Sequence, residues 1–191
     1  MKGGNENHPK KGSKIKVSPI MDIEAISAIK TMLKDKPMHL ALFIVGINTA
    51  LRASDLVRLT VGQVRYIQPM GDVELRQKKR GKIRRVTLNN ACTEAILGLL
   101  GAIPMNDEDR LFPLTVPSVH RLVKGWCRKM ELRGNYGSHT LRKTFGFIQR
   151  VIFKVGLPEL TELFGHASQK QTLEYLCIQP EEIRNIYANE I

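Results

Sequence analysis

The sequence predicts a mainly α-helical fold with a small antiparallel β-sheet (α+β), and three observations support this prediction. Apolar residues recur every three or four positions over most of the chain, which is the spacing of one helix face. Short β-rich segments interrupt this pattern once, near residues 64–88. Apolar residues make up 42% of the 191 residues and charged residues 25%, a mixture typical of a globular domain with a sizeable core.

The N-terminal residues differ from the rest of the chain. Residues 1–17 carry five lysines among Gly, Asn, Pro and Ser, a composition that buries little apolar surface. We expect a flexible basic arm over residues 1–17 that binds phosphate. Residues 18–191 contain no second linker and no internal repeat, so we expect them to form one domain.

The domain begins with helices. Apolar spacing predicts a helix from about residue 18 to 34, and Pro37 separates it from a largely buried helix over Met38–Leu51. Ser54 and Asp55 are candidate caps of a short helix that ends near Leu59.

Three short β-rich segments follow, at Val64–Ile67, Asp72–Arg76 and Ile83–Leu88. A polar turn with a glycine, Gln77–Lys82, joins the last two and gives this hairpin a strongly basic tip. The helical pattern then returns and predicts these remaining helices: Cys92–Leu100, Ser118–Glu131, Ser138–Val155, Pro158–Phe164, Gln169–Leu176 and Glu181–Asn189.

Composition narrows the classes of function. The formal net charge of +12 favours a polyanionic partner, nucleic acid first, although a ribosomal or membrane-surface protein would share it. The longest apolar run has eight residues, too few to cross a bilayer, and no secretory signal precedes it. The three cysteines form no CxxC pair, so we expect reduced thiols in the core, no zinc site and a cytoplasmic protein.

Two basic features lie in the first half of the domain. Arg52 follows a predicted buried helix, where it either compensates the helix dipole or, held by Asp55, presents its guanidinium to a phosphate. Residues 74–85 hold seven basic side chains against one acidic one. Such a hairpin is either a solvated turn or a finger that places an ammonium against DNA.

Three further features lie in the second half. Ser138 is a candidate N-cap, which places His139 and Arg142 one turn apart near the positive end of the following helix. The pair is either a surface pair or an anion site. Gly165 is typical of a left-handed helix C-cap, and His166 follows it. Tyr175 comes nine positions after His166; it either packs by its ring or acts as a nucleophile.

Taken together, these features form one ordered set: Arg, a hairpin lysine, His-x-x-Arg, Gly-His and Tyr. In this order and spacing the chain resembles the catalytic domain of the tyrosine recombinases, the phage integrase family, from about residue 20 to the C-terminus. The resemblance implies that family's catalytic-domain fold and a site-specific recombinase or integrase, a DNA strand transferase that cleaves and rejoins DNA through a 3′-phosphotyrosine.

By this resemblance the catalytic residues are Arg52, Lys79, His139, Arg142, His166 and Tyr175, with Asp55 as a supporting acid. Counting back from Val86-Thr87-Leu88 selects Lys79 in the hairpin, while Lys78 and Lys82 remain alternatives. Further DNA contacts are expected from Lys78, Arg80, Lys82, Arg84 and Lys143.

The resemblance also implies a mechanism. The two arginines hold the non-bridging oxygens of a phosphodiester while Tyr175 attacks phosphorus and Lys79 protonates the leaving 5′-oxygen. His139 assists proton transfer and His166 adds a hydrogen bond. The expected partners are double-stranded DNA and further copies of the chain in a tetrameric synapse, with no metal ion, nucleotide or other cofactor.

One departure and two alternatives accompany this interpretation. Most members carry a core-binding domain before the catalytic one, and the residues ahead of the first predicted helix are too few for it; the chain is then either a short member or a fragment. The segment from residue 181 onward either folds onto its own core or packs on a neighbouring protomer. Relaxation of DNA in the manner of type IB topoisomerases, or a non-catalytic DNA-binding or regulatory module, are the competing functions.

Overall fold

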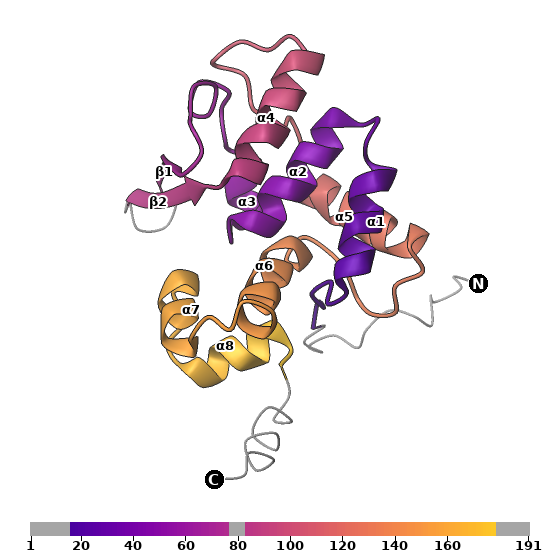
Figure 1. Cartoon of the computed structure of the whole chain (residues 1–191), viewed down its shortest axis with the longest axis vertical. Coiled ribbons are helices and arrows are strands. Elements are labelled where there is room, and N and C mark those ends of the chain that lie inside the picture. Colours follow the sequence, from indigo (N-terminus) through magenta and orange to yellow (C-terminus); the bar gives the residue numbers. More distant parts are fainter. Residues whose placement is uncertain (1–15, 77–82, 179–191) are drawn as a thin grey trace, which may run out of the picture.

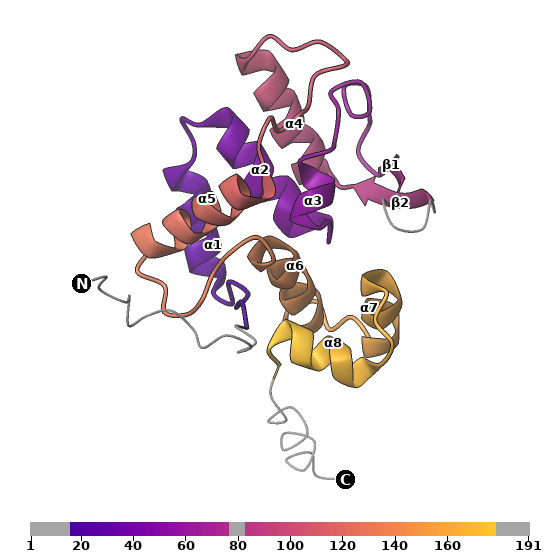
Figure 2. The ribbon, with the colours of Figure 1, turned by 180° about the vertical axis from the view of Figure 1, so that it is seen from behind.

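The computed structural model describes residues 16–76 and 83–178, and these form helices with one β-hairpin (Figures 1 and 2). None of the helices in these ranges is both long and apolar enough to cross a membrane. The elements run in the order α1 (Ile23–Met32), α2 (Pro37–Asn48), α3 (Ala53–Leu56), β1 (Gly71–Arg76), β2 (Ile83–Leu88), α4 (Asn90–Ala102), α5 (Val116–Lys129), α6 (Thr140–Val151), α7 (Leu157–Phe164) and α8 (Gln169–Leu176).

Helix α2 is central because it packs against both α4 and α6. The larger core gathers residues of α1 to α6 and both strands, and Phe43 of α2 meets Trp126 of α5 edge to face at 5.8 Å between ring centroids. Gly46 of α2 allows a close approach, since a Cβ there would lie 2.5 Å from the Leu141 side chain of α6. The fit between α2 and α6 therefore fixes where α6 stands.

The three C-terminal helices form a separate group beneath this core (Figure 1). Helices α6, α7 and α8 pack against one another around a smaller buried cluster of Ala50, Leu160, Phe164 and Leu176. Ala50 comes from the segment between α2 and α3, so this cluster also joins the C-terminal helices to the first half of the chain.

Side-chain caps set the starts of several helices. Asn89 accepts a hydrogen bond from the backbone N–H of Cys92 at the start of α4, and Ser168 accepts one from Gln171 at the start of α8. Helix α8 spans the predicted range, Gln169–Leu176, and Gly165 ends α7 in the left-handed conformation, with φ 66°.

The sheet consists of β1 and β2, which pair antiparallel in the register Gly71↔Leu88 to Arg76↔Ile83. The predicted third strand, Val64–Ile67, is wrong. These residues form consecutive turns, in which the N–H of Arg65 donates to the carbonyl of Val61. The Arg65 side chain forms an ion pair with Asp107 at 2.6 Å. The apolar residues of this segment therefore pack as part of a turn and do not pair with a neighbouring strand.

Other boundaries differ from the predictions by a few residues. Helix α1 begins at Ile23 with Asp22 as its cap, not at residue 18. Arg52, not Ser54, precedes α3, and His139, not Ser138, is the N-cap of α6. The hairpin tip, most of the basic arm (residues 1–15) and the helix expected over 181–189 lie outside the described residues.

Candidate active site

Arg142 is the best-anchored polar side chain among the predicted site residues. It lies in the first turns of α6 and only 3% of its surface is exposed. Its guanidinium donates hydrogen bonds to the backbone carbonyls of Ala50 and Phe164, the latter at 3.0 Å, and lies over the Phe164 ring at 4.6 Å. These bonds employ two of the five N–H groups of an arginine and leave others for an anion.

Ala50 presents its carbonyl to Arg142 from an unusual backbone conformation. Its φ of 52° lies in the left-handed region, which costs an alanine about 1–2 kcal/mol. The preceding Thr49 holds the turn, because its hydroxyl donates to the Val45 carbonyl at 2.7 Å. Strained backbone of this kind persists where surrounding contacts fix it, and here it faces a buried guanidinium.

Arg52 lies two residues beyond Ala50, at the N-cap of α3, and its side chain is exposed. Arg52 and Asp55 do not form an ion pair in the described ranges. In the described ranges the ion pairs join Arg65 to Asp107 and Arg85 to Glu74, and neither involves Asp55. Asp55 acts on Arg84 instead: it opposes the lowering of the Arg84 pKa that burial causes.

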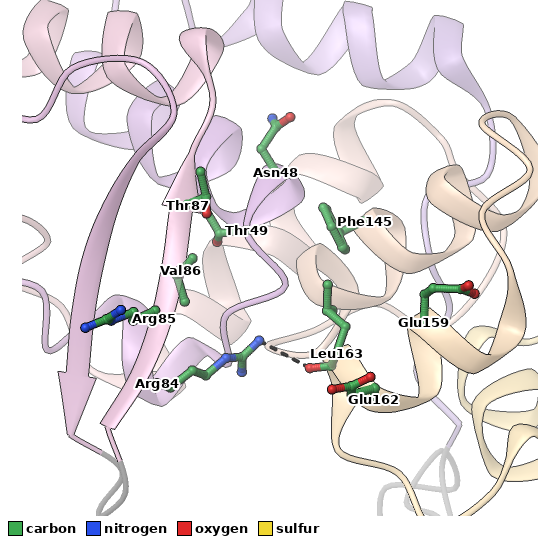
Figure 3. Close-up of a pocket in the computed structure, with 10 residues that line it drawn as sticks. All are labelled: Asn48, Thr49, Arg84, Arg85, Val86, Thr87, Phe145, Glu159, Glu162 and Leu163. Atoms are coloured by element: carbon green, nitrogen blue, oxygen red, sulfur yellow. Dashed lines mark hydrogen bonds between the residues drawn. The ribbon is translucent and has the colours of Figure 1, made fainter.

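Arg84 reaches the site from β2, and Figure 3 shows its side chain directed toward the end of α7. Its Nη2 makes a long contact of 3.5 Å with the Leu163 carbonyl. Burial lowers the pKa of Arg84, and the neighbouring Arg52 lowers it further. A cavity of about 470 Å³ opens beside Arg84 between β2 and α7, with Glu159 and Glu162 in its lining (Figure 3).

Tyr175 lies on the last turn of α8, close to Arg142. Its hydroxyl is enclosed, and the Arg142 guanidinium lies close enough to interact with it. Burial raises the pKa of Tyr175, while the positive charges of Arg142 and Arg52 oppose that rise. The ring centroid lies 5.0 Å from that of His166.

His166 is placed by the end of α7 and by a buried hydroxyl. Its N–H donates to the Thr161 carbonyl across the Gly165 turn, and its ring stacks on Phe164 with 5.4 Å between centroids. Its Nδ1 lies 3.0 Å from Oγ1 of Thr172, a fully buried side chain of α8. Burial lowers the pKa of His166, and Arg142 lowers it further, so the ring is held neutral at pH 7.

His139 is the N-cap of α6, and its side chain is exposed. Burial lowers its pKa first, followed by the charges of Arg142, Lys143 and Arg52. Burial likewise lowers the pKa of Arg142 to about 10, with Arg84 and Arg52 contributing. Arg52, Arg84, Arg142 and His139 thus act on one another electrostatically, and an anion placed among them would relieve their repulsion.

Lys143, expected to contact DNA, is 5% exposed and points inward. Its Nζ lies over the Tyr175 ring, 4.8 Å from the centroid, and 3.6 Å from Sγ of Cys177. The other predicted DNA contacts of the hairpin, Lys78, Arg80 and Lys82, and the predicted catalytic Lys79 lie outside the described residues.

Sequence reasoning missed the groups that hold these side chains. The carbonyls of Ala50 and Phe164 carry no residue-specific signal, because every residue has a carbonyl. Thr172 could have been found from the sequence, because it lies three positions before Tyr175 on the same predicted helix. In the structure it is buried in α8 and presents its hydroxyl to His166.

Comparison with known proteins shows which family and which solved structures the chain is similar to. Residues 19–182 match the model of the phage integrase family. The chain is 30% identical over 181 residues to "Probable integrase/recombinase YoeC" of Bacillus subtilis, covering 90% of this chain and 95% of that protein.

Solved structures share the fold at lower identity. The XerA recombinase superimposes with a TM-score of 0.70 at 19% identity, over 95% of this chain and 65% of that one. A lambda integrase dimer bound to a COC′ core site gives a TM-score of 0.64 at 16% identity, over 86% of this chain and 49% of that one. The chain thus spans between half and two thirds of these structures.

Proposed function

The chain belongs to the phage integrase family, the tyrosine-type site-specific recombinases, and from this membership we propose the following reaction. It cleaves one strand of double-stranded DNA with Tyr175, forms a 3′-phosphotyrosine, and rejoins the 3′ end to a different 5′-hydroxyl. The observation that supports this proposal most is the placement of the Tyr175 hydroxyl, which is enclosed beside the Arg142 guanidinium and close enough to interact with it.

The phosphate is bound by arginines in this proposal. Attack on a phosphodiester is slow because its non-bridging oxygens repel a nucleophile and gain charge in the transition state. Arg142, fixed by the carbonyls of Ala50 and Phe164, meets that charge with preorganised N–H groups. Arg52 is exposed and its charge acts on Arg142, and Arg84 adds positive potential.

Two protons must move during cleavage. The phenol of Tyr175 loses its proton, and burial makes the phenolate costly until cations and the phosphate geometry compensate. We assign to neutral His139 the exchange of that proton, and to His166 a hydrogen bond to a phosphate oxygen. Lys79 protonates the leaving 5′-oxygen.

Strand exchange also requires more than one subunit. The bond energy is kept in the phosphotyrosine, so exchange needs a second DNA site and further subunits to supply the incoming 5′-hydroxyl. A homologue has been crystallised with transposon right end DNA and another as a dimer on a core site. We propose a tetrameric synapse on DNA, working in the cytoplasm of a bacterial cell.

The test is the covalent adduct. Supercoiled plasmid that carries the DNA flanking the native gene is incubated at low salt without added metal, and the reaction is stopped with detergent. Wild-type protein should yield a protein–DNA adduct, and peptide mapping should locate it on Tyr175. Tyr175→Phe should yield none while its DNA affinity stays within about twofold of wild type, since only the nucleophilic oxygen is removed.

A matched control is Tyr66→Phe, because Tyr66 is 79% exposed and lies outside the site. This variant should form the adduct at the wild-type rate. An adduct that persists in Tyr175→Phe would reject Tyr175 as the nucleophile, and binding without any adduct in the wild type would favour a non-catalytic DNA-binding module.

A further inference from the structure

Lys143 is an unusual lysine because it is buried without an acidic partner. Its side chain is 5% exposed, and no Asp or Glu of the described residues lies within ion-pair distance of it. Placing an ammonium in such surroundings is unfavourable unless specific contacts compensate. A lysine whose task is to bind DNA phosphate would instead extend into solvent.

The Lys143 ammonium contacts the C-terminal end of α8. Its Nζ lies 4.8 Å from the centroid of the Tyr175 ring, a cation–π distance, and 3.6 Å from Sγ of Cys177. Cys177 is the C-cap of α8 in the left-handed conformation, with φ 61°. Lys143 therefore touches both the predicted nucleophile and the residue that ends its helix.

The position of Lys143 in α6 gives these contacts a consequence. It directly follows Arg142, and both residues are fixed by the same helix. The contacts of Lys143 with the end of α8 thus help to set the distance between the Arg142 guanidinium, which binds phosphate in the proposed reaction, and the Tyr175 hydroxyl, which attacks it. A misplacement of about 1 Å between reacting groups can cost about 100-fold in rate.

We propose that Lys143 is a positioning residue for Tyr175. Its ammonium contacts the tyrosine ring and Cys177, and these contacts hold the nucleophile at the correct distance from Arg142. It acts through Tyr175 and does not touch DNA. This inference rests on the proposed function, because it assumes that Tyr175 is the nucleophile.

The geometry favours a cation at this position over an apolar side chain of the same length. A methionine would fill the space and keep the apolar contacts of the stem, but it would lose the attraction between the ammonium and the face of the ring. Arginine keeps the cation and stacks on aromatic rings. The three side chains thus separate packing from charge.

The experiment compares Lys143→Met, Lys143→Arg and the control Lys170→Met, which removes the same charge from an exposed site on α8. DNA affinity is measured by fluorescence anisotropy at several salt concentrations, and adduct formation is timed with saturating protein. We expect Lys143→Met to slow adduct formation by about 10- to 100-fold while its affinity and salt slope equal those of Lys170→Met. Lys143→Arg should recover most of the rate.

Three results would overturn the inference. The first is an adduct rate in Lys143→Met equal to that of Lys170→Met. The second is a weaker affinity in Lys143→Met with a salt slope reduced by about one unit relative to Lys170→Met, which is the signature of a lost phosphate contact. The third is a rate in Lys143→Arg as low as in Lys143→Met.

A fourth variant covers the case in which Lys143→Met does not fold, as judged by circular dichroism. Cys177→Ala removes one of the two contacts of Lys143 and keeps the cation, so adduct formation should slow by about 3- to 10-fold at unchanged affinity. An unchanged rate of adduct formation would reject the positioning role of these contacts. A wild-type protein that forms no adduct rejects the proposed function itself and this inference with it, whereas a normal adduct in Lys143→Met rejects the inference alone.

Discussion

At the scale of the residue, Arg142 is held by uncharged groups. The carbonyls of Ala50 and Phe164 orient the guanidinium without neutralising it. A carboxylate partner would orient it equally well, but would offset the positive charge that a phosphate needs. The hydroxyl of Thr172 does the same for His166, because it fixes the ring and adds no charge.

Arg142→Lys tests this arrangement. A lysine ammonium is a point charge on a different stem and cannot reach two carbonyls and a phosphate in the fork geometry of arginine. We expect adduct formation to fall by about 100-fold or more and the free energy of unfolding to fall by about 1–3 kcal/mol, since buried carbonyls lose their donors. Urea unfolding and timed adduct assays measure the two effects.

The control is Arg58→Lys, at an exposed arginine outside the described site contacts. It should change neither quantity. An Arg142→Lys variant with wild-type adduct formation would contradict the assignment of Arg142 as the phosphate-binding arginine.

At the scale of the element, helix positions could be predicted from the sequence more reliably than strands. The apolar spacing located α8 at its observed bounds and α4 to α7 within a few residues. Val64–Ile67 could not be predicted correctly, because a β-rich tetrapeptide has the same composition in a strand and in a packed turn. The contacts that decide it, such as Arg65 with Asp107, lie 42 positions apart.

The same limit applied to the candidate site. Arg52, Arg142, His166 and Tyr175 could be named from their order and spacing, and the structure brings their charges and rings close together. The inward direction of the Lys143 side chain could not be predicted, because a lysine beside an arginine on a basic helix is typical of a surface position. Only the position of α8 over α6 reveals it.

The contact between α6 and the last two helices leads to a prediction about one glycine. A Cβ on Gly146 would lie 2.5 Å from the side chain of Leu176 and 2.6 Å from the ring of Phe164. We expect Gly146→Ala to lower the free energy of unfolding by about 1–3 kcal/mol, because the added methyl overpacks this contact. It should also slow adduct formation, since α8 carries Tyr175.

The matched control is Gly98→Ala in α4, where a Cβ would meet nothing within 4 Å. Alanine there should raise the free energy of unfolding by about 0.5–1 kcal/mol through its helix preference. Urea unfolding measures the free energy of unfolding of both variants. An equal change in the two variants would show that α6 and α8 do not pack as described.

At the scale of the whole molecule, positive charge is spread beyond what the fold itself requires. The net charge is +12, and burial lowers the pKa values of Arg84, Arg142 and His166, with neighbouring cations lowering them further. The stability of the protein should therefore depend on pH through the histidines.

We expect the free energy of unfolding to decrease as the pH falls from 7.5 to 5.5. Burial lowers the pKa values of His39, His139 and His166 in the folded state. The unfolded chain takes up protons near pH 6.5, while the folded chain resists protonation, so acid favours unfolding. The slope stays below about 1.4 kcal/mol per pH unit for each histidine, because each ring takes up at most one proton on unfolding.

Urea unfolding in buffers of equal ionic strength measures this slope, in a range where carboxylates remain ionised. A free energy of unfolding that stays constant or rises between pH 7.5 and 5.5 would contradict the neutral state assigned to these histidines. Bound DNA should reduce the slope, since phosphate favours the protonated rings.

The burial of Leu176 bears on where a strand-cutting tyrosine can act. Leu176 is 0% exposed and covers Gly146, so lifting α8 away from α6 would expose it to water at a cost of about 1.5–3 kcal/mol. The detached arrangement would then be occupied by fewer than about one molecule in ten. In an isolated subunit we therefore expect Tyr175, the proposed nucleophile, to stay packed on its own domain most of the time. A neighbouring subunit that received α8 would have to bury Leu176 in an apolar site of its own.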